Sequence, residues 1–258
     1  MSDPSEYNES TESTVEQLPI EEHISEAKGG DAVAQYSLGL RYELGDGVPK
    51  SFKEAMNWYR MSAEQGYGLA QFSIGEMYYF GIGTQQSFSK AAKWYTMAAE
   101  QGIAVAQCNL GMMYGQGTGV PQSYTEAAKW YRLAAEKGDA CAQSFLGWAY
   151  FEGNGVEQSY SEAVKWWLKA ADQEDVDAQY NLGSMYEKGE GVEQSYGTAL
   201  DWYMAAAQQG DADAQFAIGS MYEEGRGVER SADEAKDWYQ LAADQDHKEA
   251  QARLEMLN

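Results

Sequence analysis

The chain is poor in basic residues, in long apolar runs, in cysteine and in histidine. It has 18 Lys and Arg against 41 Asp and Glu in 258 residues, and the formal net charge of −23 argues against nucleic-acid binding, because phosphate contacts need clustered basic side chains. No apolar run approaches the roughly 18 residues of a membrane span, and residues 1–29 show neither the basic nor the apolar segment of a secretory signal. We therefore expect a cytoplasmic protein that binds neither nucleic acid nor membrane.

Cysteine and histidine are also too few for most chemistry that depends on them. Cys108 and Cys141 cannot form a disulfide framework, and we expect them to be reduced, packed thiols. His23 and His247 lie at opposite ends of the chain, so histidine-dependent catalysis and His-rich metal sites lack their residues. The sequence assigns no catalytic residue, no metal ligand and no cofactor, and we expect a protein that is not an enzyme.

What the chain does have is a repeat with a period of 36 residues. The motif Ala-Gln-x-x-(Leu/Ile)-Gly recurs in phase at Ala34, Ala70, Ala106, Ala142, Ala178 and Ala214, and a Tyr and a Trp follow each copy at fixed spacing. The period defines an acidic leader, six repeats that we number 1 to 6, and a partial copy, which span 1–29, 30–65, 66–101, 102–137, 138–173, 174–209, 210–245 and 246–258. A fixed period of this length is typical of a solenoid.

Each repeat is expected to form a pair of antiparallel helices, and repeat 4 illustrates the first of them. Asp139 suits an N-cap, and Leu146 continues an apolar stripe at helical spacing. Gly147 in mid-helix costs about 1 kcal/mol relative to Ala. Because all six repeats carry this glycine, we expect it to let the paired helix approach closely. Gly153 and Gly155 end the helix in a Gly-x-Gly turn, which we interpret as structural because it follows a helix rather than a strand.

The second helix of repeat 4 is expected to open at Ser159. Glu162 stands three residues later, which predicts a Ser-x-x-Glu capping box. Ala163, Trp166 and either Ala170 or Ala171 are expected to mark the inner face of this helix. Neither helix can bury its apolar stripe alone, so stacking of neighbouring repeats must supply the core.

The two ends of the chain differ from the repeats. Residues 246–258 repeat the pattern of a first helix but carry Glu255 where the glycine would stand. This predicts a C-terminal capping helix against which no second helix packs closely. Residues 1–13 are polar and expected to be disordered, while Pro19–Lys28, with Ile20 and Ile24, predicts a short N-terminal cap helix.

The repeat resembles the Sel-like repeat family, whose members are related to tetratricopeptide repeats. Repeat 3 shows the pattern in full, with Ala106-Gln107, Leu110-Gly111, Tyr114, Gly117-Thr118-Gly119-Val120, Ala127, Trp130-Tyr131 and Ala134-Ala135. The resemblance covers residues 30–258 and implies a scaffold that binds proteins, of a kind common in bacterial signalling, secretion and host interaction. Secreted members carry a cysteine pair in each repeat, so this chain resembles an intracellular form. We therefore expect an all-α fold, a right-handed α-α superhelix (solenoid) of six 36-residue helix-turn-helix repeats plus a C-terminal capping helix.

Partner binding is expected on the first helices, which line the concave face of related solenoids. The positions opposite the core stripe are apolar in repeats 1 to 4 and polar or acidic in repeats 5 and 6. We expect a partner to contact Leu40, Leu44, Leu69, Glu76, Phe80, Val105, Met112, Phe145, Trp148 and Glu152. Phe145 and Trp148 are the strongest candidates, because aromatic residues dominate binding hot spots. The alternative is that tight packing between adjacent first helices buries them.

Negative charge is concentrated at the two ends of the sequence. The net charge is −7 in the leader and −6 in each of repeats 5 and 6, but between −1 and +1 in repeats 1 to 3. Such a surface steers a basic partner, although acidic faces also serve solubility. The leading hypothesis is a non-catalytic scaffold or adaptor that binds a protein or peptide, basic in one version. The alternatives are an immunity protein that neutralises a basic toxin, a bacterial effector that engages host proteins, and a hydrolase, for which no catalytic constellation is present.

Overall fold

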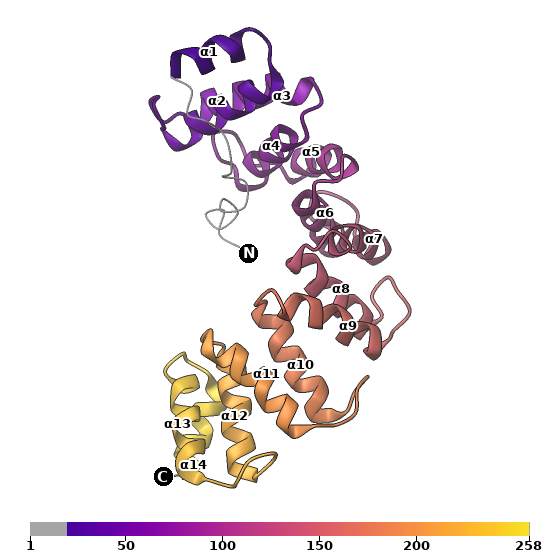
Figure 1. Ribbon diagram of the computed structural model, residues 1–258, viewed down its shortest axis with the longest axis vertical. Coiled ribbons are helices and arrows are strands. Elements are labelled where there is room, and N and C mark those ends of the chain that lie inside the picture. The colour runs from indigo at the N-terminus through magenta and orange to yellow at the C-terminus, as the bar shows by residue number, and fades with distance from the viewer. Residues whose placement is uncertain (1–19, 258) are drawn as a thin grey trace. The chain divides into compact units, whose positions relative to one another are not determined.

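The computed structural model describes residues 20–257, which form fourteen α-helices and no strand (Figure 1). The helices are α1 (Ile20–Lys28), α2 (Ala32–Leu44), α3 (Phe52–Glu64), α4 (Gly68–Phe80), α5 (Phe88–Glu100), α6 (Ala104–Gln116), α7 (Tyr124–Ala135), α8 (Ala140–Glu152), α9 (Tyr160–Ala171), α10 (Val176–Lys188), α11 (Tyr196–Gln208), α12 (Ala212–Glu224), α13 (Ala232–Ala243) and α14 (Lys248–Leu257). The chain divides after Ile103 into two compact parts, an N-terminal part with α1–α5 and a C-terminal part with α6–α14. Within each part consecutive helices pack as pairs, which confirms the expected all-α solenoid.

The mid-helix glycine of each first helix sits directly against an aromatic ring of the second helix. A Cβ atom on Gly147 of α8 would lie 2.5 Å from Trp167 Nε1 of α9, and one on Gly75 of α4 would lie 2.5 Å from the ring of Tyr95 in α5. No real Cβ approaches a neighbour so closely, so the two helices could not come this near with any other residue. The expectation that the glycine admits the paired helix is confirmed.

The aromatic ring that fills the core of each pair is the second of the Trp-Tyr dipeptide, which corrects the sequence analysis. In α9 the buried side chain is Trp167, 1% exposed, whereas Trp166 is half-buried. Trp166 packs against the apolar cluster that α7 and α8 form where two pairs meet, which includes Leu146 of α8, and Lys169 Nζ lies 4.0 Å from the centre of its ring. Trp202 packs in the same way against the cluster that α9 and α10 form. The first ring therefore packs at the junction of successive pairs, while the second fills the space that the glycine leaves.

Hydrogen bonds fix where the helices begin. The Asp139 carboxylate accepts a hydrogen bond from the backbone N–H of Ala142 at 2.7 Å, as an N-cap should. Ser159 Oγ accepts from the backbone N–H of Glu162 at 3.3 Å, which is one half of the predicted capping box. The other half does not form as predicted, because the backbone N–H of Ser159 donates instead to the carbonyl of Tyr150 at 2.9 Å. The start of each second helix is thus tied to the first helix of its own pair.

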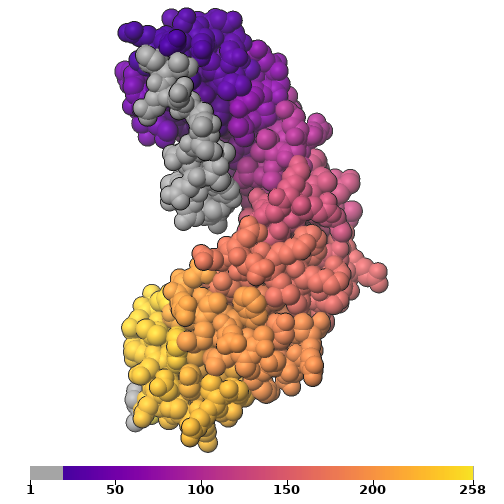
Figure 2. Space-filling view, in the orientation of Figure 1, coloured from indigo at the N-terminus to yellow at the C-terminus, as the bar shows by residue number. Residues whose placement is uncertain are grey.

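The glutamine of the Ala-Gln motif links neighbouring repeats inside the protein. Gln143 is buried, and its Nε2 donates to the carbonyl of Ala135 at the end of the preceding α7. Its Oε1 accepts from Nε2 of Gln173, which ends the repeat, at 2.9 Å. Gln71 makes the same two bonds in the N-terminal part. Buried polar groups need such partners, so the glutamine holds the repeat spacing. In the space-filling view, successive pairs from α8 onward touch without a gap on the face drawn (Figure 2).

The Gly-x-Gly turns pack against the preceding repeat. Gly153 adopts a left-handed conformation with φ of 74° and caps α8 by donating to the carbonyl of Ala149. A Cβ on Gly155 would lie 2.1 Å from the carbonyl oxygen of Tyr124 at the start of α7. The interpretation of these turns as structural is therefore confirmed.

The two ends carry single helices. Helix α1 lies where the sequence predicts a short helix and packs through Ile20, Ile24 and Ala27 against Leu38 of α2. Helix α14 packs through Ala250 against α13. The disorder expected for residues 1–13 concerns a segment outside the described residues. None of the helices within 20–257 combines the length and apolar character that a bilayer crossing requires.

Candidate functional site

The ten residues predicted to contact a partner are neither fully buried nor uniformly exposed. Leu44, Phe80 and Trp148 are 64%, 44% and 38% exposed, and Glu152 is exposed as well. The other six, which are half-buried, are Leu40, Leu69, Glu76, Val105, Met112 and Phe145. Met112 and Phe145 also pack against an apolar core cluster while keeping part of their surface in solvent. Partial exposure leaves these residues accessible, and their contact with a partner stays a prediction.

Four of the predicted residues come together around a hollow in the C-terminal part. The hollow has a volume of about 320 Å³ and lies between α6, α7 and α8. Met112 of α6 and Phe145, Trp148 and Glu152 of α8 line it. Val105, also in the C-terminal part, is not among its lining residues.

The aromatic walls of the hollow are held in place from behind. Phe145 stacks on Tyr131 of α7 with ring centres 5.1 Å apart and an interplanar angle of 16°. Trp148 makes edge-on contacts with Trp167 and Phe151, each with ring centres 5.5 Å apart. Such aromatic pairs contribute about 0.5–1.5 kcal/mol beyond the area they bury. The rings are therefore already ordered before any partner arrives.

Sequence reasoning missed the contribution of α7 to the hollow. Tyr124 and Tyr131 line it together with the residues of the first helices. Tyr124 is 46% exposed at the first position of α7, where other second helices begin with Phe52, Phe88 or Tyr160. An aromatic residue that recurs at the start of the second helices is a signal that could have identified it.

The remaining predicted residues lie in the N-terminal part, where an acidic pair forms. Glu43 of α2 accepts a hydrogen bond from the hydroxyl of Tyr59 at 2.5 Å. Desolvation by burial, reinforced by the negative charge of Glu43, raises the pKa of Glu76 on α4 to about 7. The Tyr59 hydroxyl has a strongly raised pKa, through burial and then the nearby Glu43 carboxylate, so it remains a donor at neutral pH. The carboxyl group of Glu76 therefore keeps its proton up to a pH close to 7.

The equivalent carboxylates of the C-terminal part are neutralised by arginines. Glu187 accepts a hydrogen bond from Tyr203 at 2.7 Å and forms an ion pair with Arg226. Glu223 accepts from Tyr239 and lies 3.6 Å from Arg253 Nη1. Each arginine comes from the following repeat or from the capping helix.

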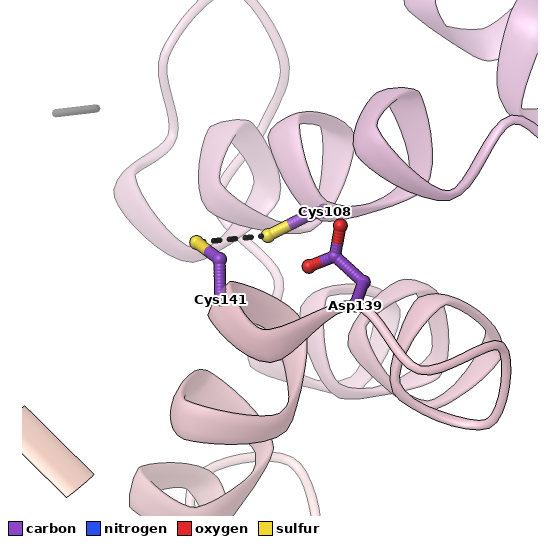
Figure 3. Close-up of side chains that lie close together, drawn as sticks. All are labelled: Cys108, Asp139 and Cys141. Carbon is purple, nitrogen blue, oxygen red and sulfur yellow. Dashed lines mark hydrogen bonds between the residues drawn. The ribbon is translucent and has the colours of Figure 1, made fainter. Parts of the chain in front are cut away.

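A third group of polar side chains bridges α6 and α8. Cys108, Asp139 and Cys141 each place one sulfur or oxygen atom within 4.8 Å of the others (Figure 3). The two sulfurs are 3.3 Å apart, and both cysteines are free thiols. The sequence analysis expects packed thiols at these positions; the carboxylate beside them was assigned only a capping role.

Stacked helix pairs joined by buried glutamines and glycine-aromatic contacts define a helical-repeat protein of the solenoid class. The Sel1 repeat model matches six segments, at residues 32–67, 68–103, 104–139, 142–175, 176–211 and 212–247. The chain belongs to the Sel1 repeat family. Proteins of this family are non-catalytic scaffolds that generally mediate protein–protein interactions.

Two solved structures show how similar the relatives are. A protective antigen with an SLR fold from uropathogenic Escherichia coli is 40% identical, with a TM-score of 0.87 over 92% of this chain and 51% of its own. This chain therefore spans about half the length of that relative. A Sel1 repeat protein from Oxalobacter formigenes is 36% identical, with a TM-score of 0.73 over 83% of this chain and 85% of its own. A search of the curated proteins finds no match.

Proposed function

We propose that the chain is an interaction scaffold and that the hollow between α6, α7 and α8 receives an apolar side chain of a partner protein or peptide. The observation that carries the proposal is a cavity of about 320 Å³ whose walls include Met112, Phe145 and Trp148. Methionine and aromatic residues are enriched at the centres of protein interfaces. Because Phe145 is held by stacking and Trp148 by edge-on aromatic contacts, binding there costs little side-chain entropy.

We propose further that the partner is basic. Glu152 lies at the hollow, and repeats 5 and 6 each carry a net charge of −6. Complementary charge speeds diffusional encounter and orients the partner. An immunity protein or inhibitor that covers a basic toxin is the narrower form of this proposal. An association rate that does not change with ionic strength would contradict the proposal that the partner is basic. It would not contradict the proposal that the hollow receives an apolar side chain.

The test replaces the two aromatic residues with side chains that the same scaffold already accepts. Phe145→Asn copies repeats 3 and 5 at this position, and Trp148→Ser copies repeats 5 and 6. Wild-type protein is immobilised and used to capture the partner from a lysate of the cells that produce this chain. The Kd of the complex between the captured partner and each variant is then measured. Truncating one hot-spot residue costs at least about 2 kcal/mol, so we expect the Kd of the double variant to rise at least about 30-fold.

Leu241→Ser is the matched control, because Leu241 is an apolar residue of α13, 48% exposed and outside the hollow. We expect its Kd to equal that of the wild type. Circular dichroism and denaturation of each variant separate lost binding from lost folding. A double variant that is folded and binds the partner within about threefold of the wild type would show that the hollow is not the binding site.

A further inference from the structure

Cys108, Asp139 and Cys141 converge where α6 meets the start of α8. Cys108 lies on α6 and is 2% exposed, Asp139 is the N-cap of α8, and Cys141 lies in its first turn and is half-buried. Figure 3 shows the two sulfurs facing each other with the carboxylate beside them. The Sγ atoms are 3.3 Å apart, and all three groups lie within 4.8 Å of one another.

The cluster stands at a junction that other repeats fill in a different way. At the position of Cys108, repeats 1 and 6 carry Tyr36 and Phe216. Tyr36 contacts Tyr67 with ring centres 5.3 Å apart, and Phe216 stacks on His247 at 4.8 Å. The residues that replace an aromatic contact here are two thiols and a carboxylate. A packing role alone does not call for this choice, because an aromatic contact fills the same junction after repeats 1 and 6.

We propose that Cys108, Cys141 and Asp139 bind a thiophilic divalent cation, Zn²⁺, with two sulfur ligands and one oxygen ligand. Zn²⁺ bonds sulfur at about 2.3 Å, so two sulfurs on one tetrahedral ion lie about 3.8 Å apart. The observed 3.3 Å is within about 0.5 Å of that separation, whereas a disulfide of about 2.05 Å would need a larger movement. Three protein ligands leave one tetrahedral position, which water or a partner side chain fills.

Binding exchanges protons for the ion. Both cysteines are free, and they hydrogen-bond to each other through their sulfur atoms. Each thiol loses a proton to the solvent as its sulfur–zinc bond forms, and the Asp139 carboxylate binds without losing one. Two protons are therefore released per ion, and affinity falls as the pH falls.

The proposal is tested with Co²⁺, which reports thiolate ligands by a near-ultraviolet charge-transfer band and tetrahedral geometry by visible d–d bands. The full chain is first reduced, and the reductant is then removed under anaerobic conditions. A thiol assay checks that both cysteines are free. We expect one Co²⁺ to bind per chain, with both sets of bands, and one equivalent of Zn²⁺ to displace it. We also expect Zn²⁺ to raise the unfolding midpoint of the wild-type chain.

The variants again use residues that the scaffold accepts. Cys108→Ser copies repeat 4, Cys141→Val copies repeats 1 and 3, and each is expected to abolish the charge-transfer band and the Zn²⁺-dependent rise in midpoint. Asp139→Asn keeps an N-cap acceptor but removes the anionic ligand, so Zn²⁺ affinity should fall at least about 10-fold. Asp175→Asn is the matched control. It alters the equivalent cap of α10, where the neighbouring side chain is the Ser144 hydroxyl, and should leave affinity unchanged.

Two results would overturn the proposal. One is a reduced wild-type chain that shows no charge-transfer band with excess Co²⁺. The other is a folded Cys108→Ser or Cys141→Val chain that binds Zn²⁺ as tightly as the wild type, because the ion would then be bound by exposed carboxylates and not by the two cysteines. Neither result depends on the partner proposed for the hollow.

Discussion

Replacing Gly147 by alanine should destabilise the protein although alanine is the better helix former. The added Cβ would lie 2.5 Å from Nε1 of Trp167, which is fully buried and donates a hydrogen bond to the Ser144 carbonyl at 3.2 Å. Overpacking costs about 1–3 kcal/mol, and losing that hydrogen bond in a buried site costs about 1–3 kcal/mol. The gain in helix propensity is only about 1 kcal/mol. We therefore expect a net loss of about 3 kcal/mol.

Urea denaturation followed by circular dichroism and by tryptophan fluorescence measures this loss. Gly115→Ala is the control, since Gly115 also lies in a first helix but a Cβ there would meet its nearest neighbour, the Tyr131 hydroxyl, at 3.7 Å. That substitution should leave stability unchanged or raise it by up to about 1 kcal/mol. If Gly147→Ala were as stable as Gly115→Ala, the close approach of α8 and α9 would not be what the glycine is for.

Two further predictions concern half-buried carboxylates. Glu76 has a pKa of about 7 in the folded chain against 4.5 for a free carboxyl, so the folded state holds a proton between these values that the unfolded state has lost. Stability should therefore fall by up to about 3 kcal/mol as pH rises from 4.5 to 8, and Glu76→Gln should remove this part of the slope in urea midpoints. An unchanged slope in that variant would contradict the assignment. Arg226→Met removes the partner of Glu187 and should destabilise the chain by about 1–3 kcal/mol at pH 7, measured by the same titration; no loss would mean that solvent compensates Glu187.

Most of the fold could be predicted from the sequence, because each structural feature of the repeat occurs six times. The period predicts the helix pairs, and the shared glycine predicts that the two helices of a pair approach closely. The period does not predict which aromatic ring of the second helix contacts the glycine. Trp166 and Trp167 are adjacent and both aromatic, and only the orientation of α9 decides which of them faces Gly147. The capping box failed in part for a similar reason, since the Ser159 N–H is used by Tyr150, which belongs to another helix.

The candidate site was predictable only where the repeats differ. Met112, Phe145 and Trp148 depart from their equivalents and line one hollow, so comparison between repeats identified them. The contribution of α7 was not predicted, because Tyr131 is part of the shared repeat pattern and has an aromatic equivalent in every repeat, so comparison between repeats does not mark it; it also packs in the core. The cluster of Cys108, Asp139 and Cys141 was missed for a different reason. Asp139 was fully explained as a helix cap, and nothing in one repeat shows that the cap faces a cysteine of the preceding repeat.

Net charge by repeat does not show where uncompensated negative charge lies. Repeats 5 and 6 carry −6 each, yet their half-buried carboxylates, Glu187 and Glu223, are paired with Arg226 and Arg253. In the nearly neutral repeats 1 and 2, no ion pair is found for Glu43 within residues 20–257, and the charged group facing it is Glu76. A carboxylate removed from water without a cation is costly, so Glu76 keeps a proton near neutral pH. The same Tyr–Glu contact is thus balanced by an arginine in one part of the chain and by a proton in the other, and pH acts mainly on the second.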